Sequence, residues 1–168
     1  MKKTIYLLLG IILSLISCGK KTDFTLKGNI SDLNSDTILV YYQLPKFKLD
    51  TIITQNGEFN YHIQPDTFTI FNLVFDSINS YPIYADKGGR FEINGTLSDF
   101  NIKGDGENLE QYRIMSYLKQ VPNDSIEYKV DSIIRSNGHS FTNIYLLDKY
   151  FVHDSTPDYT KIKELINK

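Results

Sequence analysis

Apolar and polar residues alternate with a period of two from Phe24 to about Lys103. Segments 24–30, 59–63 and 91–93 each place apolar side chains at every second position. Such alternation is typical of strands with one face on a core and the other in solvent. Short runs rich in Asn, Asp and Gly interrupt the alternation at regular intervals. The pattern therefore predicts about eight strands in an antiparallel β-sandwich or half-open barrel.

Three features refine the expected strands. Asn56-Gly57 can take the positive φ values of a tight hairpin, so we expect segments 51–54 and 59–63 to pair across it. The glycine-rich stretch 86–90 is interpreted as a hairpin loop, with a phosphate-binding loop as the alternative. Pro82 removes a backbone donor, which favours an edge strand or the start of a strand.

The spacing changes to about 3.6 residues after Gly106, which predicts helices. Asn108 is expected to cap the first helix, and Pro122 separates it from a second helix that ends near Gly138. Ser140 is expected to cap the third helix, and Thr156 followed by Pro157 the fourth. The expected apolar faces of these last two helices are Phe141, Ile144, Leu147 and Phe151, then Ile162, Leu165 and Ile166.

The predicted fold class is α+β, because strands precede helices along the chain. A mainly antiparallel β-sandwich or half-open barrel of about eight strands is followed by a short α-helical annex. The expected units are a leader (1–17), a tether (18–23), a β-rich domain (24–106) and a helical annex (107–168). Twelve Tyr and ten Phe without any Trp agree with a β-rich core.

The first 18 residues have the organisation of an export signal. Lys2-Lys3 precede a short apolar run, which ends in Leu15-Ile16-Ser17-Cys18. The run is too short for a membrane-spanning helix, which needs about 20 residues. The stretch resembles the bacterial lipobox, and that resemblance implies cleavage before Cys18 and lipidation of its thiol and amine. A free thiol or an intermolecular disulfide at Cys18 is the alternative.

Charge excludes one class of partner. Loss of Lys2 and Lys3 with the leader changes the formal net charge from −2 to −4. Nucleic-acid binding requires a basic stripe, which this balance does not supply. The pair Lys20-Lys21 beside the anchor is also shorter than a polybasic membrane patch, for which four to eight charges are typical.

Several motifs together resemble a domain of unknown function in Bacteroidota lipoproteins. They are segment 24–30 (FTLKGNI), Asp50-Thr51, segment 56–59 (NGEF), segment 104–108 (GDGEN) and segment 140–151 (SFTNIYLLDKYF). The resemblance covers most of the mature chain. It implies a unit that commonly precedes a thioredoxin-like domain of the TlpA kind, whose chemistry resides in a Cys-x-x-Cys pair.

This chain departs from that combination in its cysteine content. Cys18 is the only cysteine, and thiol exchange needs an attacking thiolate and usually a resolving thiol. Acylation of Cys18 would consume the sulfur, so disulfide chemistry is not expected within this polypeptide. Either the chain is a stand-alone module, or it is the remnant of a longer gene.

Few residues suggest catalysis, and we expect no cofactor, no metal and no enzymatic activity. His62, His139 and His153 have no metal-ligand spacing and are interpreted as surface residues. Asp105 and Glu107 could resemble part of a calcium loop, but the other ligand positions are missing, which favours a turn. No serine lies in a nucleophile-elbow pattern.

Asp is followed by Ser or Thr unusually often. Seven of the 14 Asp residues have such a neighbour, and five of these pairs continue with Ile. Asp-Ser/Thr-apolar resembles the acceptor motif for protein O-glycosylation in Bacteroidota. Ordinary turn and cap chemistry is the alternative explanation. The candidate glycan acceptors are Thr37, Thr51, Ser77, Ser125 and Ser132.

These observations predict a lipid-anchored cell-envelope protein, most simply on the outer membrane facing the periplasm. We expect it to act as a non-catalytic binding or scaffold module, with the membrane and an envelope protein or thioredoxin-like protein as partners. One alternative is the truncated accessory half of a thioredoxin-like lipoprotein. Another is a small glycan- or peptide-binding lipoprotein, whose groove would be lined by Tyr41-Tyr42 or by Tyr81 and Tyr84.

The lipid anchor gives the first prediction. Replacing Cys18→Ala should leave the leader uncleaved or release the protein from the detergent phase, because the thiol that would accept the lipid is gone. Detergent partitioning and intact mass of the native protein measure both effects. Unchanged partitioning of the variant would contradict lipidation, and a wild-type mass of peptide plus lipid alone would exclude a glycan.

Overall fold

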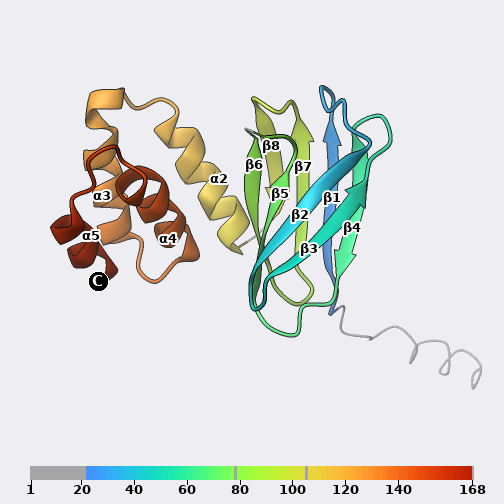
Figure 1. Cartoon of the computed structure of the whole chain (residues 1–168), viewed down its shortest axis with the longest axis horizontal. Helices are drawn as coiled ribbons and strands as arrows, with labels where there is room; N and C mark the ends of the chain where they lie inside the picture. Colours follow the sequence, from blue (N-terminus) through green and yellow to red (C-terminus); the bar gives the residue numbers. More distant parts are fainter. Residues whose placement is uncertain (1–21, 78, 105, 168) are drawn as a thin grey trace, which may run out of the picture.

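The computed structural model describes residues 22–77, 79–104 and 106–167. Figure 1 shows two bodies side by side, a sandwich of strands and a group of helices. The sandwich comes first in the chain, and the connection between the bodies lies between Gly104 and Gly106. The predicted order of a β-rich domain followed by a helical annex is thereby confirmed.

The strands form two four-stranded sheets. Sheet A has the order β4-β1-β7-β8, and sheet B has the order β3-β2-β5-β6. Neighbouring strands run antiparallel, except that β1 and β7 are parallel. The strands of sheet A are β1 (Phe24–Ile30), β4 (Glu58–Ile63), β7 (Arg90–Gly95) and β8 (Phe100–Gly104). Those of sheet B are β2 (Thr37–Leu44), β3 (Lys48–Ile53), β5 (Thr69–Val74) and β6 (Ser80–Ala85).

The turn at Asn56-Gly57 is confirmed, but the pairing predicted across it is wrong. Both residues have positive φ, 52° and 79°, as a tight turn requires. However, β3 pairs with β2 and β4 pairs with β1, and a single bridge between Gln55 and Glu58 joins the two. The turn therefore carries the chain from sheet B to sheet A, which lets both sheets contribute an inner face to one core.

The loop after β6 differs from expectation in the same way. Strands β6 and β7 lie in different sheets, so segment 86–89 crosses between the sheets and is not a hairpin loop. Pro82 lies in β6 at the edge of sheet B, as predicted. Local turn chemistry indicates that the chain reverses here, but not which neighbour each strand takes.

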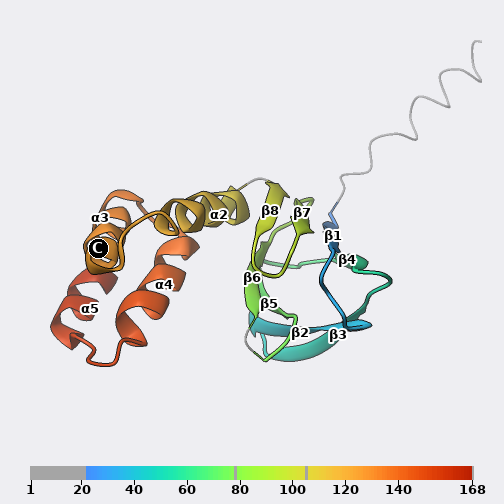
Figure 2. The ribbon, with the colours of Figure 1, turned by 90° about the horizontal axis from the view of Figure 1, so that it is seen from above.

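The core fills the space between the sheets, which Figure 2 shows from above. The inward positions of both sheets carry the alternating apolar residues, and Phe24, Phe71 and Phe91 are fully buried. The rings of Phe24 and Phe71 meet edge to face across the sheets, with centroids 6.3 Å apart. Burial of such apolar surface is the main favourable contribution to folding.

Gly28 provides space for a core ring. It is paired with Phe59 across β1 and β4, and the Phe59 ring lies directly beneath it. A Cβ atom at Gly28 would lie 2.0 Å from Cζ of Phe59. Only a residue without a side chain can therefore occupy this inward position while the ring stays in place.

The helical annex has its own core. Its elements are α2 (Gly106–Leu118), a 3₁₀ turn (Asn123–Ser125), α3 (Ile126–Ser136), α4 (Phe141–Leu147), a π-helical turn (Asp148–Val152) and α5 (Tyr159–Ile166). Leu118, Val130, Leu146, Phe151 and Leu165 are buried together at its centre. None of the helices in the described ranges is both long and apolar enough to span a membrane.

Two predicted helix caps are wrong and one is confirmed. Asn108 lies inside α2 and is buried, so it is not a cap. Asp158, not Thr156, caps α5 by accepting hydrogen bonds from the amides of Thr160 and Lys161. Ser140 caps α4 as predicted, since its hydroxyl accepts from the Thr142 amide at 3.1 Å.

The apolar faces of α4 and α5 were predicted only in part. Phe151, Ile162 and Leu165 are buried. Ile144 and Ile166, which were expected in the core, are exposed. Leu146 is buried instead of Ile144. The prediction assumed an α-helical spacing up to Phe151, but the turn after Leu147 is π-helical, which changes the residues of α4 that share a face with Phe151.

Helix α2 attaches the annex to the sandwich. It contacts β6 and β8, the strands at one edge of the two sheets (Figure 1). The side chain of Asn108 accepts a hydrogen bond from the Tyr84 amide (2.9 Å) and donates one to the Tyr84 carbonyl (2.6 Å). This amide takes the place that a neighbouring strand would have along edge strand β6. Next to it, Phe68 stacks on Phe141 of α4 at 4.2 Å.

Packing at Gly28 gives the second prediction. Gly28→Ala should lower the free energy of unfolding by about 1–3 kcal/mol, because the added methyl group forces the Phe59 ring to move. Urea unfolding measures the change. Asn29→Ala, whose side chain points outward on the same strand, is the control and should have an effect within about 0.5 kcal/mol. Equal stability of Gly28→Ala and wild type would contradict the packing described.

Candidate functional site

The outer face of sheet A is polar. Outward positions of neighbouring strands form cross-strand rows, such as Asn60, Lys27 and Glu92. The next row contains Glu58, Asn29 and Asn94. These side chains alternate with the buried residues of the same strands. The polar rows are therefore the solvent side of the pattern from which the strands were predicted.

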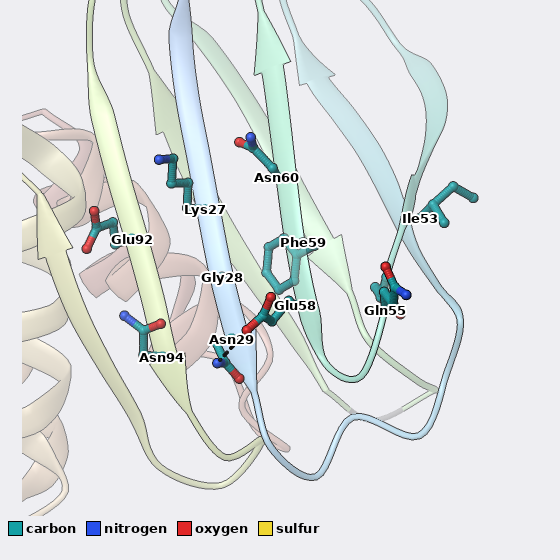
Figure 3. A pocket seen from close by; sticks show the side chains of 11 residues that line it. Lys27, Gly28, Asn29, Ile53, Gln55, Glu58, Phe59, Asn60, Glu92 and Asn94 are labelled. Atoms are coloured by element: carbon teal, nitrogen blue, oxygen red, sulfur yellow. Dashed lines mark hydrogen bonds between the residues drawn. The ribbon is translucent and has the colours of Figure 1, made fainter.

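An open groove of about 690 Å³ lies on this face and extends past β4 to Ile53 at the end of β3. Figure 3 shows the side chains of Lys27, Asn60 and Glu92 standing along it, each from a different strand. The amide of Asn29 donates a hydrogen bond to Glu58 at 3.4 Å, and Phe59 lies beneath the backbone at Gly28. The groove offers amide, carboxylate and ammonium groups to a polar ligand. No ring of its described lining residues is exposed.

The outer face of sheet B is different, because apolar side chains outnumber neutral polar ones there, although Thr51 lies opposite Leu39 and Thr37 opposite Ile53. Outward positions of β2 and β3 carry Leu39, Tyr41, Leu49 and Ile53, which we call the apolar face. Tyr41 and Leu49 are directly opposite each other. Ile53 is 72% exposed and Leu49 is 54% exposed. Val74 of β5 extends the face beside Leu39.

This contrast separates an ordinary solvent face from an unusual one. Single exposed apolar side chains are normal, whereas several that adjoin on one sheet face mark an interaction surface. Sheet A shows that the same fold can carry a polar outer face. The apolar face is therefore the candidate functional site of the described residues.

A polar network closes the gap between the edge strands β3 and β4. The hydroxyl of Tyr61 donates to Asp50 at 2.9 Å, and the hydroxyls of Tyr61 and Tyr42 are 2.6 Å apart. Lys48 forms an ion pair with Asp50 at 3.0 Å and lies 5.3 Å from the centre of the Tyr42 ring. Since these strands are not paired with each other, side chains join the two sheets here.

The protonation states in this network favour a structural role. Burial raises the pKa of Tyr61 and of Tyr42 above their ordinary value. Both hydroxyls therefore stay neutral at physiological pH. The hydrogen bond from Lys48 holds the pKa of Asp50 below its ordinary value, and the bond from the Thr51 amide adds to this.

The tyrosines expected to line a ligand groove lie elsewhere. Tyr42 and Tyr84 are buried, Tyr42 in the sandwich core and Tyr84 against α2 and Phe141. Tyr81 packs on Phe91 and Phe100. Of these four tyrosines, only Tyr41 belongs to the apolar face.

The histidines are separate from one another. His62 is exposed beside Thr25 (3.3 Å), and His153 is exposed beside Asp148 (3.4 Å). His139 lies at a hollow of about 350 Å³ in the annex, among Phe141, Ile144 and other apolar residues. The described residues contain no group of three or more His, Cys, Asp or Glu that could hold a metal ion.

Asp105 lies outside the described residues, and Glu107 has a structural role. The Glu107 carboxylate accepts hydrogen bonds from the hydroxyl of Ser140 (2.8 Å) and from the amide and hydroxyl of Thr142. It thus joins the start of α2 to the start of α4. Cys18 and residues 18–21 of the tether also lie outside the described residues, so lipidation stays a prediction.

The candidate glycan acceptors are spread over the molecule. Thr37, Thr51, Ser77 and Ser132 are exposed, and Ser125 is half-buried. Two of the preceding carboxylates accept hydrogen bonds from nearby backbone amides. Asp50 accepts from the Thr51 amide, and Asp76 accepts from the Asn79 amide at 2.8 Å.

The apolar face was not recognised from the sequence, although a signal for it exists. Segment 37–44 (TILVYYQL) is apolar at both phases of the strand period. A strand with one solvent face should alternate, whereas one that is apolar on both sides needs a second cover. The signal could be noticed, but only the structure shows that Leu39, Leu49 and Ile53 stay exposed among the described residues.

Acid sensitivity of Asp50 gives the third prediction. The pKa of Asp50 is lowered from 3.8 by folding, so its ionised form stabilises the fold above that pH, and this contribution is lost as pH falls through the folded pKa. Asp50→Asn should therefore lower stability at pH 7, and its difference from wild type should shrink below pH 3.8. Urea unfolding over this pH range measures the difference. Asp66→Asn, in an exposed loop, is the control, and a pH-independent deficit of Asp50→Asn would contradict the assignment.

Comparison with known proteins identifies a family for this chain but no function. No curated protein matches the chain. A crystal structure of a candidate cell adhesion protein from Bacteroides ovatus ATCC 8483 matches with 13% identity and a TM-score of 0.31, over 52% of this chain and 44% of that one. The chain thus spans less than half of that protein, and a likeness at this level says nothing about function. The family model described as "Domain of unknown function (DUF4369)" matches residues 24–111, and the chain belongs to that family.

Proposed function

We propose that this protein is a lipid-anchored cell-envelope module that binds another envelope protein and catalyses no reaction. The observation that carries the proposal is the apolar face of sheet B, opposite a sheet whose outer face is polar. Exposed apolar side chains that adjoin on a rigid sheet gain free energy when a partner covers them. Binding through this surface requires a complementary apolar partner and no reactive side chain.

The anchor part of the proposal rests on Cys18. The lipobox-like sequence implies a lipidated residue six positions before Phe24, the first residue of β1. Two or three acyl chains hold a protein on a bilayer without any spanning helix. We place the protein on the outer membrane, facing the periplasm, where an exported lipoprotein can meet other envelope proteins.

The proposed partner is an envelope protein with an apolar surface of its own. The edge strand β3 belongs to the apolar face, so a partner could contact both its side chains and its backbone. A thioredoxin-like protein is the specific alternative, which the resemblance to Bacteroidota lipoproteins suggests. It would make this chain an accessory half of a thiol-disulfide system whose cysteines are on the other protein.

A glycan or peptide ligand is a second alternative, and one observation favours it. The polar groove on sheet A presents amides and carboxylates that can form hydrogen bonds with hydroxyl or peptide groups. It is wide and open, and its groups also suit ordinary hydration. The apolar face therefore remains the preferred binding surface.

Cross-linking in cells gives the fourth prediction. A photoreactive amino acid in place of Leu39, at the centre of the apolar face, should form a covalent adduct with one envelope protein when cells are irradiated. Asn60, exposed on the polar face of sheet A, is the matched control and should form little adduct. Mass spectrometry of the adduct identifies the partner.

The outcomes separate the alternatives. Adducts at Leu39 that contain a thioredoxin-like protein would favour the accessory role. Adducts at Asn60 without any at Leu39 would contradict binding through the apolar face and favour the polar groove.

A further inference from the structure

The connection between β2 and β3 exposes apolar side chains at its tip. It consists of Pro-Lys-Phe (45–47), and with Leu44, the last residue of β2, we call it the 44–47 loop. Phe47 is 67% exposed and Leu44 is 45% exposed, and Lys46 between them is exposed too. Phe47 is supported from one side only, by an edge-to-face contact with Tyr41 at 5.2 Å. An aromatic ring, an aliphatic side chain and a cation therefore project together from one loop.

The loop lies at the end of the sandwich where the described chain begins. Figure 1 shows the start of β1 and the β2–β3 connection at the same end, and the β3–β4 connection at the opposite end. Strand β1 runs away from that end and β2 runs back to it, because consecutive strands reverse direction. The start of β1 and the 44–47 loop are thus held by the same rigid sandwich.

The proposed anchor restricts how far this end can be from a bilayer. Cys18 lies six residues before Phe24, and a fully extended chain spans at most about 3.5 Å per residue. The first residue of the sandwich is then within roughly 20 Å of the lipid attachment. Loops at the opposite end face away from the bilayer in that arrangement, whereas loops at the near end can touch it.

Among the loops at the near end, the 44–47 loop has the composition suited to a bilayer. Segment 64–68 contains Asp66, and segment 86–89 contains Asp86 beside Lys87. The 44–47 loop has no acidic residue, and the nearest one, Asp50, is paired with Lys48. Apolar side chains flanking a cation match the boundary between acyl chains and anionic headgroups.

We infer that the 44–47 loop inserts into the interfacial layer of the bilayer that holds the anchor. Phe47 and Leu44 lie at the acyl boundary, and Lys46 lies among the lipid phosphates. The inference rests on the proposed lipid anchor at Cys18. A single loop is too small to hold the protein on a membrane, so it acts together with the anchor. Its effect is to fix the orientation of the sandwich. The part of the apolar face around Ile53, at the end of β3 away from the loop, then stays accessible.

The lack of tryptophan in the chain provides a direct test. Phe47→Trp introduces a single fluorescent reporter at the loop tip. The native lipidated variant is reconstituted into phosphatidylethanolamine–phosphatidylglycerol vesicles with and without bromine on the acyl chains. We expect a blue-shifted emission and strong loss of emission with brominated lipid.

Ile53→Trp is the matched control, since Ile53 is exposed on the same strand pair at the opposite end of β3. Its emission should be unshifted and unaffected by brominated lipid. If Phe47→Trp is not quenched while intact mass shows lipid on Cys18, the loop does not touch the bilayer, and the inference is overturned although the anchor stands. Equal quenching of both reporters would overturn the orientation that the inference assigns to the loop. A shift of Phe47→Trp that appears only after adding solubilised envelope proteins would also overturn it in favour of a protein contact.

Failure of the anchor itself is recognised separately. If the native protein carries an unmodified Cys18, the proposed anchor is wrong. The Phe47→Trp chain is then tested as a free protein with the same vesicles. Quenching there would support a loop that binds lipid without an anchor, and the lack of quenching would overturn the inference together with the anchor.

Discussion

Strand β2 has apolar side chains on both of its faces, and the fold can cover only one of them. The inward side chains, Ile38 and Val40, are buried in the sandwich. The outward ones, Leu39 and Tyr41, have no further layer above them in the part of the chain that the structure describes. On sheet A the same geometry gives polar outward positions, so the fold does not require this exposure. Binding is the simplest physical reason for a sequence to keep apolar residues there.

The annex has a different relation to the sandwich, because it seals an edge. Asn108 pairs with the backbone of Tyr84, and Gln111 accepts a hydrogen bond from the Tyr84 hydroxyl at 2.7 Å. An edge strand that is capped in this way cannot recruit another strand. The match to the family model ends at residue 111, so the matched range includes the part of α2 that makes these contacts. At the opposite edge, β3 and β4 are each the last strand of their sheet, and side-chain hydrogen bonds at Asp50 join them next to the apolar face.

The sequence alone was enough for the fold class but not for its topology. The period of two at segments such as 24–30 follows from burial of one strand face, so the strands could be predicted. Partner choice depends on contacts between distant segments, which is why the pairing across Asn56-Gly57 was wrong. Asn108 shows the same limit, since a helix cap and a buried amide look alike until the neighbouring backbone of Tyr84 is known. Ser140 was predicted correctly because its capping bond is local.

The most direct test of binding through the apolar face is hydrogen–deuterium exchange of the protein in native envelope fractions compared with the purified protein. If the apolar face is covered in the envelope, peptides from β2 and β3 should exchange more slowly there, while peptides from β1 and β4 on the polar sheet should exchange equally in both. Equal exchange of β2 and β3 in the two states, or protection confined to β1 and β4, would contradict a partner on the apolar face.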